Sequence, residues 1–241
     1  MKKVLIAVPN EGHIDTQVVK ALLDIRWGKE YQKSIILPMM DMPIENSRAH
    51  TINYFLKGDW DYLFSMDADN PPLSDPLELI ELDLDLVGYP TPIWCWNREK
   101  NKGPYPIEWN VYDYNFEEGP NRHKQHEPRE GLQEVDAIGS GAFLVARRVL
   151  EHPTVRYQPF QRRWNDDGTV LLGSDLAFCQ KVKKAGFKIH AHFGHICLHY
   201  KQVELTAVID GWNSFYQRKK NKWEKELAEK SHNKFLVESQ V

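Results

Sequence analysis

The first ninety residues alternate between short apolar runs and segments in which apolar positions recur every three or four residues. Short apolar runs that end at proline, glycine or aspartate are typical of buried strands. The expected strands span 3–8, 34–37, 61–66 and 85–89. Helical spacing predicts helices after Asp15, at 45–56 and at 76–82. Strands that alternate with helices form right-handed βαβ units, so this half predicts an α/β fold with a parallel sheet.

Residues 90–134 break this rhythm, because they are rich in proline, tryptophan, tyrosine and charge. We expect an irregular insertion there, since a loop of this length is usually functional or mobile. Order returns with apolar runs at 135–138 and 142–145. A helix at 174–185, closed by a glycine, and a strand at 187–192 are expected to follow.

This pattern divides the chain into a main domain at 1–202, which contains the insertion at about 90–134, and a helical tail at 203–241. The tail mixes lysine and arginine with glutamate, which is typical of a solvated helical face. A partner contact, including a homo-oligomer interface between such helices, is the alternative.

Composition narrows the classes of protein. The 241 residues include 31 basic and 34 acidic side chains, a net charge of −3, which argues against binding to a nucleic-acid polymer. The odd set of three cysteines excludes a disulfide framework. The apolar run at 4–8 is too short for a signal peptide, and no run reaches about 18 apolar residues. We therefore expect a cytoplasmic protein without a transmembrane segment.

The sharpest local motif is Asp67-Ala68-Asp69, directly after the strand expected at 61–66. Ligands of open α/β sheets bind beyond the carboxyl ends of the strands. Two carboxylates at such a place can hold a divalent metal, and the metal can bridge to phosphate oxygens. An ordinary loop also favours aspartate in its turns, so the motif alone leaves both interpretations open.

Histidines cluster near the end of the main domain, at His190, His192, His195 and His199. A lone histidine is usually structural, but a cluster together with an aspartate pair makes a metal site equally plausible. Aspartate and imidazole together suit Mn²⁺ better than Ca²⁺, because imidazole is a softer ligand than a carboxylate.

Asp175 lies in the first turn of the helix expected at 174–185. A capping aspartate, which stabilises a helix by about 1 kcal/mol, is the simpler explanation. A general base exposed at the edge of the sheet is the alternative, since the helix dipole favours the ionised carboxylate.

Taken in order, these motifs resemble the family-2 glycosyltransferases of the GT-A fold, particularly short single-domain bacterial and phage-type members. The resemblance covers 4–196 and leaves out the tail from about Val203. The matching segments are Val8-Pro9-Asn10, Asn46-Ser47-Arg48-Ala49, Asp67-Ala68-Asp69, residues 135–145, residues 174–179 and Gly194-His195-Ile196. It implies a GT-A, Rossmann-like fold: a mostly parallel sheet flanked by helices, here with a C-terminal helical extension.

The resemblance also implies a metal site for Mn²⁺ or Mg²⁺. Asp69 matches the closer metal ligand of the D-x-D pair, and Asp67 the residue that contacts ribose or metal-bound water. His195 matches the family's late metal-binding histidine. His199 is its rival, because the Gly-His match is only two residues long.

Asp175 matches the aspartate that serves as base on the acceptor hydroxyl in inverting members. Ser174 stands where the family has glutamate. The resemblance thus implies transfer of a sugar from a nucleoside-diphosphate sugar, a UDP- or GDP-sugar, to a carbohydrate or other hydroxyl acceptor, with inversion.

Further residues match the family's donor site. Pro9, Asn10 and Glu11 match the loop that borders the nucleotide base, and Arg48 an arginine that contacts the base or the diphosphate. Gly139, Ser140 and Gly141 match a small-residue loop that lets sugar and acceptor approach the backbone.

Two other functions remain open. A sugar nucleotidyltransferase would normally carry a glycine-rich loop with arginine or lysine after the first strand, whereas 9–13 holds one glycine and neither cation. A nucleotide-sugar-binding protein without transferase activity is the second.

The aromatic residues of the insertion predict either an acceptor platform or a packed core. They include Trp94, Trp96, Tyr105, Trp109 and Tyr112.

Overall fold

The computed structural model describes residues 1–25, 31–39, 42–94, 107–114, 123–127 and 130–201, with 209, 213, 216, 217 and 219–224. It divides the chain into two compact units. One comprises Met1–Ile93 with Glu108–Tyr200, and the other Trp94–Ile107 with Lys201–Val241. The candidate site lies entirely in the first unit. The domain boundaries expected from the sequence remain a prediction.

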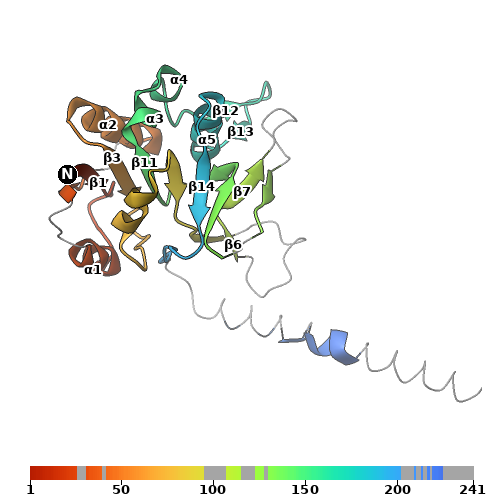
Figure 1. The fold of residues 1–241 in the computed structure, drawn as a ribbon. Coiled ribbons are helices and arrows are strands. Elements are labelled where there is room, and N and C mark those ends of the chain that lie inside the picture. Colours follow the sequence, from red (N-terminus) through yellow and green to blue (C-terminus); the bar gives the residue numbers. More distant parts are fainter. Residues whose placement is uncertain are drawn as a thin grey trace, which may run out of the picture. The chain divides into compact units, whose positions relative to one another are not determined.

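A seven-stranded sheet forms the centre of the first unit (Figure 1). Its strands, in spatial order, are β2 (Tyr31–Ile36), β1 (Lys2–Ala7), β3 (Tyr62–Met66), β11 (Ala142–Ala146), β4 (Leu86–Gly88), β14 (Ile189–His192) and β9 (Leu132–Val135). β2, β1 and β3 pair in parallel, as do β4 and β14. The predicted α/β class with a mostly parallel sheet is confirmed.

Two strands run against the parallel direction of the sheet. β11 pairs antiparallel with both β3 and β4, with Leu144 opposite Phe64 on one side and Val87 on the other. β9 also runs antiparallel to its neighbour β14. The first four strands are therefore not consecutive in the sheet, because a strand from the second half of the chain separates the third from the fourth.

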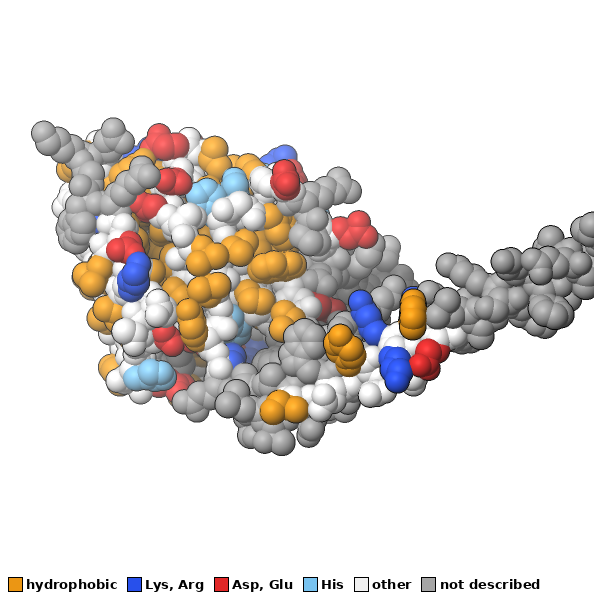
Figure 2. Space-filling view, turned by 90° about the horizontal axis from the view of Figure 1, so that it is seen from below, with side chains coloured by type: hydrophobic (Ala, Val, Ile, Leu, Met, Phe, Trp, Pro, Cys, Tyr) orange, Lys and Arg blue, Asp and Glu red, His pale blue; other side chains and the backbone are white. Residues whose placement is uncertain are grey.

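Helices cover both faces of the sheet (Figure 1). α2 (Ile44–Lys57), α3 (Arg147–Glu151), α4 (Pro153–Arg156) and α5 (Ser174–Lys184) pack on one hydrophobic core. α1 (Thr16–Asp24) and η1 (Pro76–Leu82), which is a 3₁₀ helix, pack on the other. α1 begins as expected, because the Asp15 carboxylate accepts a hydrogen bond from the Gln17 amide. Seen from the side on which α1 lies, hydrophobic side chains gather over the middle of the described surface (Figure 2).

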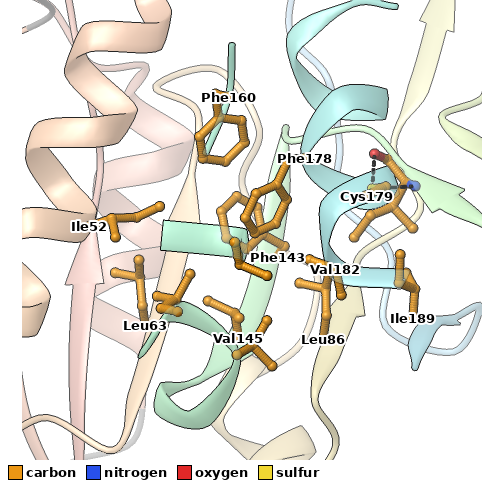
Figure 3. Close-up of a cluster of buried hydrophobic side chains, with 14 of the residues drawn as sticks. Ile52, Leu63, Leu86, Phe143, Val145, Phe160, Phe178, Cys179, Val182 and Ile189 are labelled. Carbon is orange, nitrogen blue, oxygen red and sulfur yellow. Dashed lines mark hydrogen bonds between the residues drawn. The ribbon is translucent and has the colours of Figure 1, made fainter. Parts of the chain in front are cut away.

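The core between the sheet and α2–α5 is built on an aromatic group (Figure 3). Phe160 and Phe178 stack with ring centroids 4.5 Å apart, and Phe143 of β11 lies 6.0 Å from Phe178. All three rings are buried, and burial of a phenylalanine contributes roughly 1.5–3 kcal/mol. This group fixes α5 against the sheet and so fixes the position of Asp175.

Where the structure describes 90–134, this segment contains short strands. The strands found there, apart from β9, are β5 (Pro92–Trp94), β6 (Ile107–Trp109), β7 (Val111–Tyr114) and β8 (His123–Gln125). β7 pairs with β8 and with β10 (Ala137–Ile138) in a small antiparallel sheet. Each of these strands is too short for its alternation to stand out from the surrounding sequence.

Several short elements precede α5. β12 (Arg163–Trp164) and β13 (Val170–Leu172) form a hairpin whose turn contains residues 166–168, with Gly168 at φ 81°. From 209 onward the described positions are helical, as expected of the tail. Among the described residues, no helix is both long and apolar enough to cross a membrane.

Candidate active site

The D-x-D motif directly follows β3, whose five residues are all buried. The Asp67 amide donates to the Gly141 carbonyl at 2.7 Å, which extends the β3–β11 pairing by one step. Asp67 and Asp69 thus stand at the carboxyl end of a central parallel strand, where the sequence placed them.

Arg48 of α2 joins two carboxylates. Its Nη1 donates to Asp175 Oδ1 at 2.9 Å, and its Nη2 lies 3.6 Å from Asp67 Oδ1. The guanidinium also lies over the Phe160 ring, 5.3 Å from its centroid. The Arg48 side chain is only 8% exposed, so its charge is balanced by the protein's own aspartates. The resemblance implied an arginine on the base or diphosphate, whereas here the side chain is committed to Asp67 and Asp175.

Asp175 lies in the first turn of α5 and is held from several sides. Besides Arg48, it accepts hydrogen bonds from the Ser140 amide and Oγ, at 3.1 and 2.8 Å, and from Ser174 Oγ at 3.1 Å. Burial opposes ionisation, but Arg48 and the serine donors outweigh it and hold the pKa of Asp175 below its usual range. The carboxylate is therefore ionised and fixed, with 34% of its side chain exposed.

Asp67 has the opposite electrostatic environment. Burial raises its pKa, Arg48 lowers it, and the nearby carboxylates of Asp175 and Asp69 raise it again, to about 6. Among the described side chains at this edge, the three carboxylates of Asp67, Asp69 and Asp175 thus outnumber the one guanidinium of Arg48. Such an arrangement favours a cation.

The structure separates the two candidate histidines. His199 Nε2 lies 3.5 Å from Asp69 Oδ2, whereas His195 Nδ1 lies 2.7 Å from Ser74 Oγ. The His195 ring also packs edge-on against His192, with centroids 4.6 Å apart. The contact geometry favours His199, the rival choice, as the partner of Asp69.

The segment that carries His199 runs antiparallel to the chain that follows Asp69. The Leu198 amide donates to the Pro71 carbonyl at 2.9 Å, and the Tyr200 amide to the Asp69 carbonyl at 3.0 Å. The buried side chain of Asn70 adds a hydrogen bond to the Leu198 carbonyl at 3.1 Å. These bonds place the imidazole of His199 beside the Asp69 carboxylate.

The His199 ring is also oriented by the backbone. Its Nδ1 lies 2.7 Å from the Pro92 carbonyl, which only accepts, so the proton belongs on Nδ1. In the neutral ring Nε2 then carries the lone pair, and it faces Asp69. A backbone carbonyl that orients the second nitrogen is a common feature of metal-ligating histidines.

These residues fit a divalent metal held jointly with a ligand. Two donor atoms about 2.0–2.2 Å from one metal lie roughly 3 Å apart, close to the 3.5 Å between Asp69 and His199. Among the described residues, no three histidine, cysteine, aspartate or glutamate side chains form a metal-binding group. Phosphate oxygens and water usually complete such sites in nucleotide-binding proteins.

The loop residues match their expected roles less directly. The buried Asn10 amide donates to the Val8 and Pro38 carbonyls and accepts from the Gly12 amide, so it shapes the loop itself. Pro9 is buried and Glu11 is exposed. Their contact with a nucleotide base remains a prediction.

Gly139 and Gly141 make room for the protein's own side chains. A Cβ on Gly139 would lie 2.6 Å from Asn110 Nδ2, and one on Gly141 would lie 2.7 Å from Asn70 Oδ1. Close approach of an asparagine side chain explains both glycines, and their predicted contact with sugar and acceptor remains a prediction. Ser140 between them is the residue whose role the sequence did not reveal, since its bond to Asp175 spans 35 positions.

The described aromatic residues of the predicted insertion serve packing. Trp109 meets Phe193 edge-on, with centroids 6.4 Å apart, and Tyr112 packs against the main core. Trp96, Tyr105 and the side chain of Trp94 lie outside the described residues.

Comparisons with known proteins reveal likeness of structure only. No family model and no curated protein matches the chain. The structure of A197 from STIV is similar with 17% identity and a TM-score of 0.53, over 84% of this chain and 87% of that one. GalNAc-T7, solved with UDP, GalNAc and Mn²⁺, gives 10% identity and a TM-score of 0.47, over 84% of this chain and 44% of that one.

CMP:2-keto-3-deoxy-manno-octonic acid synthetase complexed with CTP gives 12% identity and a TM-score of 0.42, over 91% of this chain and all of that one. At these levels of identity, and with the last two scores below 0.5, the comparisons establish a fold shared with A197 and no activity.

Proposed function

We propose that this protein is a glycosyltransferase that moves a sugar from a nucleoside-diphosphate sugar to an acceptor hydroxyl. One observation carries the proposal. Asp69 with His199, and Asp67 with Asp175 through Arg48, meet at the carboxyl edge of a mostly parallel sheet. This is the edge at which α/β proteins bind nucleotides.

Asp69 and His199 would hold a divalent metal, Mn²⁺ or Mg²⁺, and Asp67 would contact ribose or metal-bound water. When bound, the metal offsets the negative charge that develops on the leaving diphosphate. Arg48, which the resemblance linked to the diphosphate, acts in this proposal by holding Asp67 and Asp175 in place.

Asp175 would act as the base. The acceptor oxygen forms a bond to the sugar carbon, the bond from that carbon to the phosphate oxygen breaks, and the nucleoside diphosphate leaves with the electron pair. The acceptor proton passes to Asp175. Because the pKa of Asp175 is low, this proton moves only as the new bond forms and the hydroxyl becomes acidic. Attack from the face opposite the phosphate gives inversion.

The alternatives predict different behaviour. A sugar nucleotidyltransferase would release pyrophosphate from a nucleoside triphosphate and a sugar phosphate. A nucleotide-sugar-binding protein would bind the same donors without turnover. The fixed, ionised Asp175, which Arg48 joins to Asp67 of the D-x-D motif, favours transfer over either.

Donor turnover with Asp175→Asn tests the proposal. A panel of UDP- and GDP-sugars is incubated with Mn²⁺ and with methyl glycosides as acceptors, and release of nucleoside diphosphate is measured. We expect the wild type to turn over at least one donor and Asp175→Asn to lose about 100-fold or more in kcat with donor binding retained. Asp167→Asn, at an exposed turn, is the matched control. Full activity of Asp175→Asn would overturn the assignment of the base.

A further inference from the structure

A pocket of about 390 Å³ adjoins the candidate active site. It is lined by the start of α2 and by residues 158–162 with Trp164, just before the β12–β13 turn. Its volume lies in the range of pockets that bind small molecules. None of the residues predicted from the sequence as site residues lines it.

Its lining combines an aromatic face with polar groups. Trp164 is 58% exposed, while the buried Phe160 lines the same pocket. Arg162 Nε donates to Glu45 Oε1 at 2.5 Å. Glu45 Oε2 is buried and finds no hydrogen-bond partner among the described side chains and backbone, so the pair retains an unsatisfied acceptor.

This combination suits a sugar ring. The C–H face of a pyranose packs on an indole, while its hydroxyls both donate and accept hydrogen bonds. A charged pair offers both kinds of partner, since Arg162 donates and Glu45 accepts. An apolar ligand would offer no hydrogen bond to the unsatisfied Glu45 Oε2, which favours a ligand with hydroxyl groups.

The pocket is joined to the proposed base by direct contacts. The Phe160 ring lies under the Arg48 guanidinium, which donates to Asp175. Glu45 and Ala49 of α2 line the pocket on either side of Arg48 in sequence. A ligand here would therefore be connected to the base through Phe160 and Arg48.

We propose that this pocket binds a sugar ring of the acceptor, with Trp164 as its stacking face and the Arg162–Glu45 pair as its hydroxyl partners. The inference rests on the proposed function for the identity of the ligand as acceptor. The binding of a carbohydrate can be tested without it.

The test is a titration followed by NMR of the tryptophan indole N–H signals in the full chain. The chain has 8 tryptophans, and Trp164→Phe identifies the Trp164 signal while keeping an aromatic face. The probes are methyl glycosides of glucose, galactose, mannose, N-acetylglucosamine and N-acetylgalactosamine. We expect at least one to shift the Trp164 signal saturably with a Kd on the order of millimolar, and Arg162→Gln to weaken that binding about tenfold.

Trp223, which is 63% exposed on the tail, is the internal control, and its signal should not move. The proposal is overturned if no glycoside shifts Trp164 up to about 100 mM, if Trp223 responds equally, or if Arg162→Gln changes nothing. UDP and GDP with Mn²⁺ are titrated in the same spectra. Glycoside binding without nucleotide binding would contradict the proposed transferase activity but support the sugar-binding pocket. Nucleotide binding without glycoside binding would contradict the sugar-binding pocket alone.

Discussion

Arg48 is a buried cation between the carboxylates of Asp67 and Asp175. The two carboxylates differ in how far their charges rely on Arg48 for compensation. Asp175 has serine donors besides Arg48, whereas the raised pKa of Asp67 reflects burial that Arg48 only partly offsets. Loss of the guanidinium would leave both negative charges close together in a partly buried site, which is strongly unfavourable.

The first prediction concerns the stability of a variant that lacks the Arg48 guanidinium. We expect Arg48→Met to lower the free energy of unfolding by about 3 kcal/mol at pH 7, because two partly buried carboxylates lose their counter-charge. Urea unfolding measures it. Arg148→Met removes an exposed arginine that pairs with Asp83 and Asp85, and should cost less than about 1 kcal/mol. Equal losses in the two variants would show that Arg48 does not bridge the aspartates.

The raised pKa of Asp67 leads us to expect that the stability of the metal-free protein depends on pH. Its pKa is about 6 in the folded state and near the usual 3.8 when unfolded, so the folded state binds more protons between these values. The contribution of Asp67 to the free energy of unfolding is therefore complete below about pH 4 and is lost as the pH rises through about 6.

The Asp67→Asn variant has no carboxylate to ionise at this position, so it should not lose stability as the pH rises through about 6. We expect the variant to match the wild type near pH 4 and to exceed it by about 1 kcal/mol at pH 7, a figure reduced for solvent screening. Thermal unfolding in EDTA across this pH range is the measurement. A difference that does not change with pH would contradict the account.

At the scale of elements, the site depends on how two loops run past each other. The turn after β3 and the segment after β14 pair through backbone hydrogen bonds, and Asn70 bridges them. Gly141 at the start of β11 packs directly against that asparagine. A change at Gly141 should therefore reach His199 without touching it.

Gly141→Ser tests this coupling. Its Cβ would lie 2.7 Å from Asn70 Oδ1, so Asn70 must shift, and we expect a loss of about 1–3 kcal/mol in stability together with weaker metal binding. Gly173→Ser is the matched control, since nothing lies within 4 Å and serine is a good residue at the start of α5. Urea unfolding and Mn²⁺ titration compare the two. Unchanged Mn²⁺ affinity in Gly141→Ser would show that the position of Asn70 does not affect the proposed metal site.

The sequence predicts elements better than it predicts their neighbours. Apolar runs revealed the buried strands, and Asp67 and Asp69 were placed correctly at a strand end. Hydrophobicity does not say which strand pairs with which, so the insertion of β11 between β3 and β4 was not foreseen. The Gly-His pattern pointed to His195, whereas the pairing of residues 196–200 with the chain after Asp69 brings His199 to the aspartate.

At the scale of the molecule, the described site belongs to one compact unit, with two hydrophobic cores on opposite faces of the sheet. The core with the stacked Phe160 and Phe178 packs against Arg48, which donates a hydrogen bond to Asp175. In the proposed metal half, phosphate oxygens of a bound nucleotide would complete the ligands that Asp69 and His199 begin. Cytoplasmic location and a homo-oligomer through the tail remain predictions.

Metal-dependent binding of a nucleoside diphosphate tests the central claim most directly. Thermal unfolding is measured with UDP, GDP, CDP and ADP, each with Mn²⁺ and with EDTA, for the wild type, Asp69→Asn, His199→Gln and His195→Gln. A ligand at 100 times its Kd adds about 2.7 kcal/mol, or a rise of roughly 5 °C or more in Tm. We predict such a rise for at least one nucleotide with Mn²⁺ only, lost in Asp69→Asn and His199→Gln and kept in His195→Gln. The absence of any Mn²⁺-dependent rise in the wild type would contradict the account.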